Sequence, residues 1–217
     1  VKVFSDKKTI KEIAKRRKKY FKKFNWSNFL TQKVFKRKNL KEFSFNGVSI
    51  NTKKIKKNNL FFAIKGKKRD GHNFVKEAIN NGATKVVVNK KIKHLPRNKI
   101  IIVKNTLSSL NDLAKSTRSN TDAQIIGITG SVGKTTTKNL ISFALKNYGK
   151  VHFSPHSYNN KFGVPLSLCN LKPKTEYGVF EIGMDKKGEI NDLSKIIQPK
   201  IALITNISEA HLKNFNS

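Results

Sequence analysis

Residues 125–137 read Ile-Ile-Gly-Ile-Thr-Gly-Ser-Val-Gly-Lys-Thr-Thr-Thr, an apolar segment that runs into a glycine-rich turn and a Lys-Thr pair. In such a turn the small residues let backbone N–H groups point inward at phosphate oxygens, and the following helix presents its positive N-terminal end. The pattern therefore predicts a strand, a phosphate-binding loop and a helix in that order, with ATP as the ligand. The residues expected to bind ATP are Gly130, Ser131, Val132, Gly133, Lys134, Thr135 and Thr136.

Two side chains of this loop have specific expected roles. Lys134 is expected to contact the β- and γ-phosphates, and the Thr135 hydroxyl to bind the Mg²⁺ that accompanies ATP. The strict pattern G-x-x-x-x-G-K-[ST] has glycine where this chain has Ile128, so the loop is a variant. The alternative is a turn that only joins a strand to a helix, but the Gly-Lys-Thr-Thr ending after an apolar strand favours phosphate binding.

The composition limits the class of protein. The chain has 217 residues, enough for one large domain or two small ones. Its apolar runs fall well short of the roughly 20 residues that a membrane helix requires, and its lysine-rich beginning lacks the apolar segment of a signal peptide. Cys169 is the single cysteine, which excludes an internal disulfide and a cluster of thiolate metal ligands. We therefore expect a soluble protein without membrane insertion, in the reducing cytoplasm.

The formal net charge of +33 is typical of proteins that bind nucleic acids. Six of the 46 basic residues are arginines, the better readers of bases, and the other 40 are lysines spread over the whole chain. This distribution favours a general lysine bias, and no specific nucleic-acid partner is expected. Residues 9–24 have the apolar spacing of a basic amphipathic helix within a leader, residues 1–42, to which we assign no function. The helix could contact RNA or an anionic membrane, or could be a solvated helix that packs through one stripe.

Two α/β units are predicted after the leader, over residues 43–118 and 119–217. In the first, apolar segments and helical spacing predict strands at 48–50, 60–64, 86–88 and 100–103 and helices at 73–81 and 106–116. In the second, they predict strands at 125–129, 151–153, 178–182 and 201–205 and helices at 134–147 and 189–197. Strands that alternate with helices imply a parallel sheet covered on both faces, whose ligands gather beyond the carboxyl ends of the strands.

Three later features fall at such strand ends or in neighbouring loops. Glu181 ends an apolar strand, where a carboxylate could bind Mg²⁺ or its water shell. Asn159 and Asn160 lie in a loop before a new helix, and their amides could contact phosphate, metal-bound water or substrate, although an Asn-Asn pair is more often only a turn. His211 follows the last strand, where it could be a metal ligand or a neutral hydrogen-bonding group.

Together these stretches resemble the central domain of the Mur ligase family. The residues that carry the resemblance are Thr129–Thr136, Asn159-Asn160 with Gly163-Val164-Pro165, Glu181-Ile182-Gly183 with Gly188-Glu189-Ile190, and Thr205-Asn206 with Ala210-His211-Leu212. The first unit is similar to the UDP-binding N-terminal domain of the same ligases through Asn59–Gly66 and Asp70–Phe74. Within the family the match is closest to the branch that adds D-Ala-D-Ala.

The resemblance implies an α/β chain in which a small mixed α/β UDP-binding domain precedes a truncated P-loop-type parallel-sheet ATPase domain. It implies a monomeric ATP-dependent amide-forming ligase, with UDP-MurNAc-tripeptide and D-Ala-D-Ala as substrates and with ATP and Mg²⁺ as cofactors. By the same resemblance the catalytic residues are Lys134, Glu181 and His211, the metal-binding residues are Thr135, Glu181 and His211, and the substrate-binding residues are Thr52, Lys53, Asn159 and Asn160.

The chain also departs from the family pattern. Where the family usually has Asp-Ser-Arg, this chain has Asn51-Thr52-Lys53, so a bidentate arginine contact is replaced by the point charge of a lysine. The chain begins with Val1 and stops before the family's carbamoylated lysine and C-terminal domain, so we expect it to be a fragment that binds nucleotide weakly and does not turn over. The alternatives are another Mur-type or folylpolyglutamate-type amide ligase and, in a different class, a basic nucleic-acid-binding module built on the leader helix.

Overall fold

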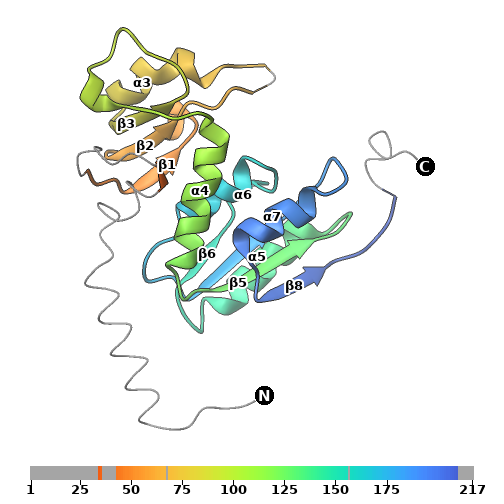
Figure 1. The fold of residues 1–217 in the computed structure, drawn as a ribbon. Coiled ribbons are helices and arrows are strands. Elements are labelled where there is room, and N and C mark those ends of the chain that lie inside the picture. Colours follow the sequence, from red (N-terminus) through yellow and green to blue (C-terminus); the bar gives the residue numbers. More distant parts are fainter. Residues whose placement is uncertain (1–33, 36–42, 67, 156, 210–217) are drawn as a thin grey trace.

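The structure is a computed structural model that describes residues 34–35, 43–66, 68–155 and 157–209. Two four-stranded parallel sheets follow one another along the chain, and the long helix α4 (Thr106–Ser119) connects them (Figure 1). The helix expected at residues 9–24 and the histidine at position 211 lie outside the described residues. Within the part of the chain that is described, no helix is both long and apolar enough to cross a membrane.

The first sheet contains β1 (Gly47–Ser49), β2 (Asn59–Phe62), β3 (Ala83–Val88) and β4 (Ile100–Ile102), in that spatial order and all parallel. Parallel neighbours need connections that cross back over the sheet. Here the connections carry η1 (Thr52–Lys54), η2 (Gly71–Phe74) with α3 (Val75–Asn80), and η3 (Arg97–Lys99). The predicted helix 73–81 is thus a 3₁₀ turn followed by a short α-helix.

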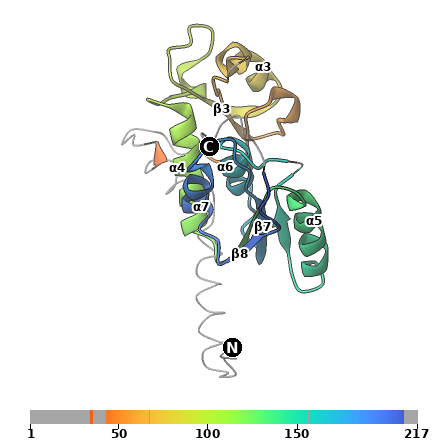
Figure 2. The same cartoon turned by 90° about the vertical axis from the view of Figure 1, so that its right-hand side faces the viewer.

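The second sheet has the strand order β6-β7-β5-β8, again all parallel. Its strands are β5 (Gln124–Thr129), β6 (Val151–Phe153), β7 (Tyr177–Glu181) and β8 (Ile201–Ile204). Helix α5 (Lys134–Leu145) covers one face, whereas α4, α6 (Gly163–Cys169) and α7 (Glu189–Ile197) lie on the other (Figure 2). The sheet places the carboxyl ends of β5, β7 and β8 next to one another, and the predicted site residues follow these ends.

Alternating side chains explain why the central strands β2, β5 and β7 are buried on both faces of their sheets. Ile126 and Ile128 of β5 pack against α5, whereas Ile125 packs against the α4, α6 and α7 side. In the first sheet, Phe61 of β2 contacts α3 and Phe62 contacts the opposite core. Each fully buried side chain of this size contributes about 1.5–3 kcal/mol of hydrophobic stabilisation.

One core joins the two units. The cluster that contains Phe62 and Ile101 of the first sheet also contains Leu110 of α4, Leu168 of α6 and Phe180 of β7. Because α4 packs against β2 on one side and against α6 and α7 on the other, it belongs to both units. The predicted division of the chain at residue 118 therefore stays a prediction.

Asn170 adds a polar connection between the units. Its side-chain Oδ1 accepts from the Val48 N–H at 2.9 Å, and its Nδ2 donates to the Val48 carbonyl at 3.0 Å. The side chain thereby pairs with β1 as a neighbouring strand would. These two hydrogen bonds fix the end of α6 against the edge of the first sheet.

Candidate nucleotide and metal site

The loop between β5 and α5 has the backbone shape of a phosphate-binding turn. Gly130 and Gly133 have φ angles of 135° and 81°, and Gly133 is the residue directly before α5. These left-handed conformations favour glycine. A side chain at Gly130 would also collide with the Thr205 hydroxyl and lie 2.9 Å from the Asn206 carbonyl oxygen. The glycines predicted from the sequence are therefore required by the geometry of the loop.

The end of β8 holds this loop in place. The Ser131 N–H donates to the Asn206 carbonyl at 3.1 Å, and the Val132 N–H donates to the Asn206 side-chain oxygen at 2.9 Å. The Thr205 hydroxyl donates to the Val132 carbonyl, and Ser131 Oγ donates to the Ser208 carbonyl at 2.7 Å. The N–H groups of Ser131 and Val132 thus already donate to acceptors within the protein. The N–H groups left to bind a phosphate are those of the first turn of α5, which lack acceptors within the helix.

The Lys134 side chain folds back over the loop. Its Nζ donates to the carbonyl of Gly130 at 2.6 Å and to that of Ser131 at 3.0 Å. The ammonium group thus lies at the glycine turn, where the β- and γ-phosphates are expected. A phosphate bound there would accept from the same ammonium group.

Thr135, Glu181 and Asn159 meet beneath the loop, although they come from three separate segments. The Thr135 hydroxyl donates to Glu181 Oε2 at 2.8 Å, and Asn159 Nδ2 donates to Glu181 Oε1 at 2.8 Å. Glu181 is the last residue of β7, pairs with Ile128 of β5 and is 1% exposed. The structure therefore brings together the predicted hydroxyl and carboxylate.

This donor set fits magnesium. A hydroxyl and a carboxylate supply the oxygen ligands that Mg²⁺ prefers, and the ion usually takes only one or two carboxylates together with substrate phosphates. Among the described residues there is no group of three or more His, Cys, Asp or Glu side chains that could hold a metal ion. Thr135 and Glu181 would bind the ion beside the phosphates.

The two amides of the predicted Asn-Asn pair have different surroundings. Asn159 contacts Glu181, and its carbonyl accepts from the Gly183 N–H at 2.7 Å. Asn160 Oδ1 instead accepts from the N–H groups of Phe162 and Gly163 at 3.1 and 3.0 Å, at the beginning of α6. The structure thus brings Asn159 to the site and uses the Asn160 oxygen to begin a helix.

The predicted substrate-binding residues Thr52 and Lys53 lie in η1. Thr52 is buried, and its carbonyl accepts from Asn81 Nδ2 at 3.1 Å, whereas Lys53 is exposed. The Asn51 side chain accepts from the Lys53 N–H at 3.0 Å and so caps this turn. The next residue, Lys54, donates to the hydroxyl of Tyr158 at 3.1 Å, and Tyr158 directly precedes Asn159 in the chain. The segment therefore lies near the amide loop.

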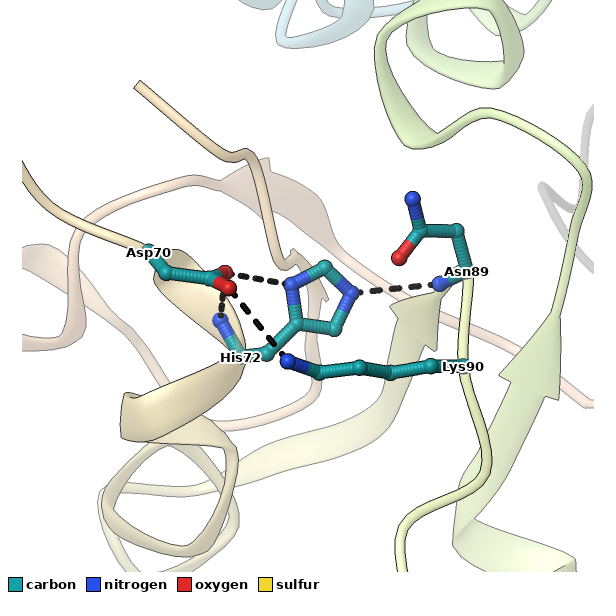
Figure 3. Close-up of polar contacts among 4 residues, drawn as sticks. All are labelled: Asp70, His72, Asn89 and Lys90. Carbon is teal, nitrogen blue, oxygen red and sulfur yellow. Dashed lines mark hydrogen bonds and ion pairs between the residues drawn. The ribbon is translucent and has the colours of Figure 1, made fainter. Parts of the chain in front are cut away.

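Asp70 and His72 make polar contacts that join two parts of the first unit, with Asn89 and Lys90 on the other side (Figure 3). His72 is 5% exposed; its Nδ1 lies 2.5 Å from Asp70 Oδ1, and its Nε2 accepts from the Asn89 N–H at 3.2 Å. Partial burial acts to raise the pKa of Asp70, but the hydrogen bonds from His72 and Lys90 outweigh it and lower the pKa to about 2. These contacts tie the beginning of η2 to the end of β3.

Lys138 is a buried residue of the site that the sequence patterns did not predict. Lys138 is 1% exposed, and its Nζ lies 3.8 Å from Glu181 Oε2. Helical spacing offers the signal that could have identified it, because residues three and four apart share a face of α5 and Lys138 follows Thr135 by three.

Two family models match the chain. The model described as the Mur ligase family, catalytic domain, matches residues 44–120, and the Mur ligase middle domain matches residues 128–217. The UDP-N-acetylmuramoyl-tripeptide–D-alanyl-D-alanine ligase of Rickettsia prowazekii is 44% identical over 172 residues, which cover 79% of this chain and 38% of that protein. The enzyme of the same name from Bacillus subtilis is 39% identical over the same shares.

Solved structures agree with these relatives. A crystal structure of MurF from Acinetobacter baumannii superimposes with a TM-score of 0.78 at 29% identity and covers 88% of this chain and 43% of its own. MurF from Thermotoga maritima in complex with ADP gives a TM-score of 0.67 at 35% identity, over 77% of this chain and 39% of its own. The chain thus spans about two fifths of the length of the relatives it matches.

Proposed function

Because this chain belongs to the Mur ligase family, we propose that it supplies the UDP-substrate and ATP-binding parts of a ligase that adds D-Ala-D-Ala to UDP-MurNAc-tripeptide during peptidoglycan precursor synthesis. The observation that carries the proposal is the contact of Thr135 and Asn159 with the buried Glu181 beneath the glycine loop. It places a hydroxyl and a carboxylate beside the lysine expected to bind phosphate. We expect the protein to act as a monomer in the cytoplasm.

The proposed reaction has two steps. The terminal carboxylate of the peptide substrate attacks the γ-phosphorus of ATP, which gives an acyl phosphate and ADP. The amino group of D-Ala-D-Ala then attacks the acyl carbon, the amide bond forms, a proton leaves the nitrogen, and inorganic phosphate departs. Phosphorylation converts a poor leaving group into a good one, so the protein contributes chiefly positioning and charge stabilisation.

The residues of this chain divide these tasks. Lys134 and the first N–H groups of α5 bind the transferred phosphoryl group. Thr135 and Glu181 would hold Mg²⁺, which would supply positive charge to stabilise the phosphates, and Asn159 orients the Glu181 carboxylate. By family resemblance, His211 serves the metal site, and Thr52 and Lys53 contact the UDP part of the substrate.

Acceptor-dependent phosphate release tests this function. The full-length gene product is mixed with ATP, Mg²⁺ and UDP-MurNAc-tripeptide, and inorganic phosphate is measured with D-Ala-D-Ala and with single amino acids as acceptors. We expect release only with the dipeptide, and Lys134→Ala to lower the rate by about 100-fold or more, as loss of a group that stabilises transition-state charge does. Turnover with a different acceptor alone would contradict the proposal and indicate another amide ligase of this superfamily.

A further inference from the structure

Lys138 has an unusual place in the fold. It lies in α5, the helix that begins at the phosphate-binding loop, and it follows Thr135 by three residues. Its side chain is 1% exposed, whereas Leu140 and Phe143 of the same helix are 65% and 72% exposed. A lysine is almost never fully buried unless it is paired. The burial of Lys138 therefore calls for a partner.

The partner is the site carboxylate. Among the Lys, Arg, Asp and Glu side chains that the structure describes, Lys138 and Glu181 are the two that are buried. Lys138 Nζ lies 3.8 Å from Glu181 Oε2, and it also donates to the carbonyl of Ser154 at 3.0 Å. A buried charge whose partner is removed is strongly destabilising, so the two charges depend on each other.

Two hydrogen-bond donors and one ammonium group surround the Glu181 carboxylate. Thr135 and Lys138 of α5 lie at Oε2, and Asn159 of the amide loop lies at Oε1. The Ser154 carbonyl in turn fixes the Lys138 ammonium group just after the end of β6. Both carboxylate oxygens are therefore held in one orientation before any ligand binds. Groups that orient a metal ligand in this way commonly set the affinity for the metal.

We propose that Lys138 is a positioning residue that holds the Glu181 carboxylate in the orientation in which it receives Mg²⁺ together with the nucleotide. This role rests on the proposed function of the loop and of Glu181. The competing explanation is purely structural: Lys138 joins α5 to β6 and stabilises the fold. The two explanations differ in whether the loss of Lys138 acts selectively on the metal-dependent part of nucleotide binding.

Calorimetric titration of the full-length gene product with ADP, once in Mg²⁺ and once in EDTA, distinguishes the positioning role of Lys138 from a purely structural one. In Lys138→Met we expect ADP affinity in EDTA to stay within about twofold of wild type, because Lys134 and the loop are unchanged. The gain in affinity that Mg²⁺ confers should fall by about tenfold or more, the usual loss on removal of a group that orients a metal ligand. Lys146→Met, a change of an exposed lysine just after the same helix, should alter neither value.

A double-mutant cycle tests the route of action. If Lys138 acts through Glu181, Lys138→Met should cause no further loss of the Mg²⁺-dependent gain in a Glu181→Gln background. Lys138→Arg should recover part of the gain, because it restores a cation. If Lys138→Met does not fold, Lys138→Gln decides the question, since its amide can still donate toward the Ser154 carbonyl without the charge.

Three results would overturn the proposal. A folded Lys138→Met or Lys138→Gln protein in which Mg²⁺ raises ADP affinity as much as in wild type would show that Lys138 does not position Glu181. Equal losses of ADP affinity in Mg²⁺ and in EDTA would show the same. Wild-type protein that binds no ADP in either condition would refute the proposed function, and the role of Lys138 would fall with it.

Discussion

Glu181 is the residue on which the proposed chemistry depends most. Its carboxylate is buried at the end of β7, where an unpaired charge would be strongly unfavourable, and contacts from Thr135, Asn159 and Lys138 compensate for the lost water. The same contacts fix its orientation beside the phosphate-binding loop. A side chain held in this way needs little reorganisation when a metal and a nucleotide bind.

His152 gives a prediction at the scale of one residue. Burial, to which the charge of Lys172 adds, lowers the pKa of His152 to about 4 from its ordinary value of 6.5, although a contact with Ser167 opposes the shift. The unfolded chain therefore takes up the proton first as the pH falls. The contribution of the lowered His152 pKa to the free energy of unfolding is complete above pH 6.5 and is lost progressively between pH 6.5 and about 4.

Chemical denaturation at a series of pH values checks this prediction. The free energy of unfolding of wild type relative to His152→Gln should fall by about 2–3 kcal/mol between the two ends of that range, since one pKa unit corresponds to about 1.4 kcal/mol. A difference between the two proteins that does not change with pH would contradict a lowered pKa of His152 in the folded protein.

At the scale of elements, the loop between β6 and α6 performs two tasks with two adjacent asparagines. Asn160 accepts from two N–H groups where α6 begins, while Asn159 donates to Glu181. The sequence pattern predicted both asparagines as one binding pair. Only the packing of the loop against β7, through the Asn159 carbonyl and the Gly183 N–H, separates their roles.

Alanine substitutions should therefore separate stability from metal binding. Asn160→Ala should lower the free energy of unfolding by about 1 kcal/mol, because the N–H groups of Phe162 and Gly163 lose their side-chain acceptor, and should leave Mg²⁺-dependent ADP affinity unchanged. Asn159→Ala should weaken that affinity by about tenfold, because Glu181 loses the donor at Oε1. The two measurements are denaturant unfolding and calorimetric titration, and the reverse pattern would show that the roles have been exchanged.

The order of strands and helices was predictable because each strand of the second unit is an apolar run that ends in polar or glycine residues. The ends of the elements were less predictable. Ile64 was expected in a strand, but the chain turns there, and the Ile64 carbonyl accepts from the Gly71 N–H. Lys138 could not be identified by residue type, because it is one of 40 lysines. Its burial is a consequence of where α5 packs on β6 and β7.

At the scale of the whole molecule, the two sheets share one core, and α4 and Asn170 hold them together. This packing places the η1 turn, with the predicted UDP-binding residues Thr52 and Lys53, near the loop that carries Asn159, through the contact of Lys54 with Tyr158. In the proposed function these two regions bind the UDP-linked substrate and ATP. The shared core sets the separation between them without a ligand.

Calorimetric titration of the full-length gene product with magnesium adenylyl-imidodiphosphate, an ATP analogue that resists cleavage, tests nucleotide binding at this loop most directly. We expect saturable heat for one site per chain, and a loss of that heat in Lys134→Ala while thermal unfolding shows that the variant remains folded. A folded wild-type protein that gives no heat on mixing would contradict the claim that the turn at residues 130–136 binds a nucleoside triphosphate.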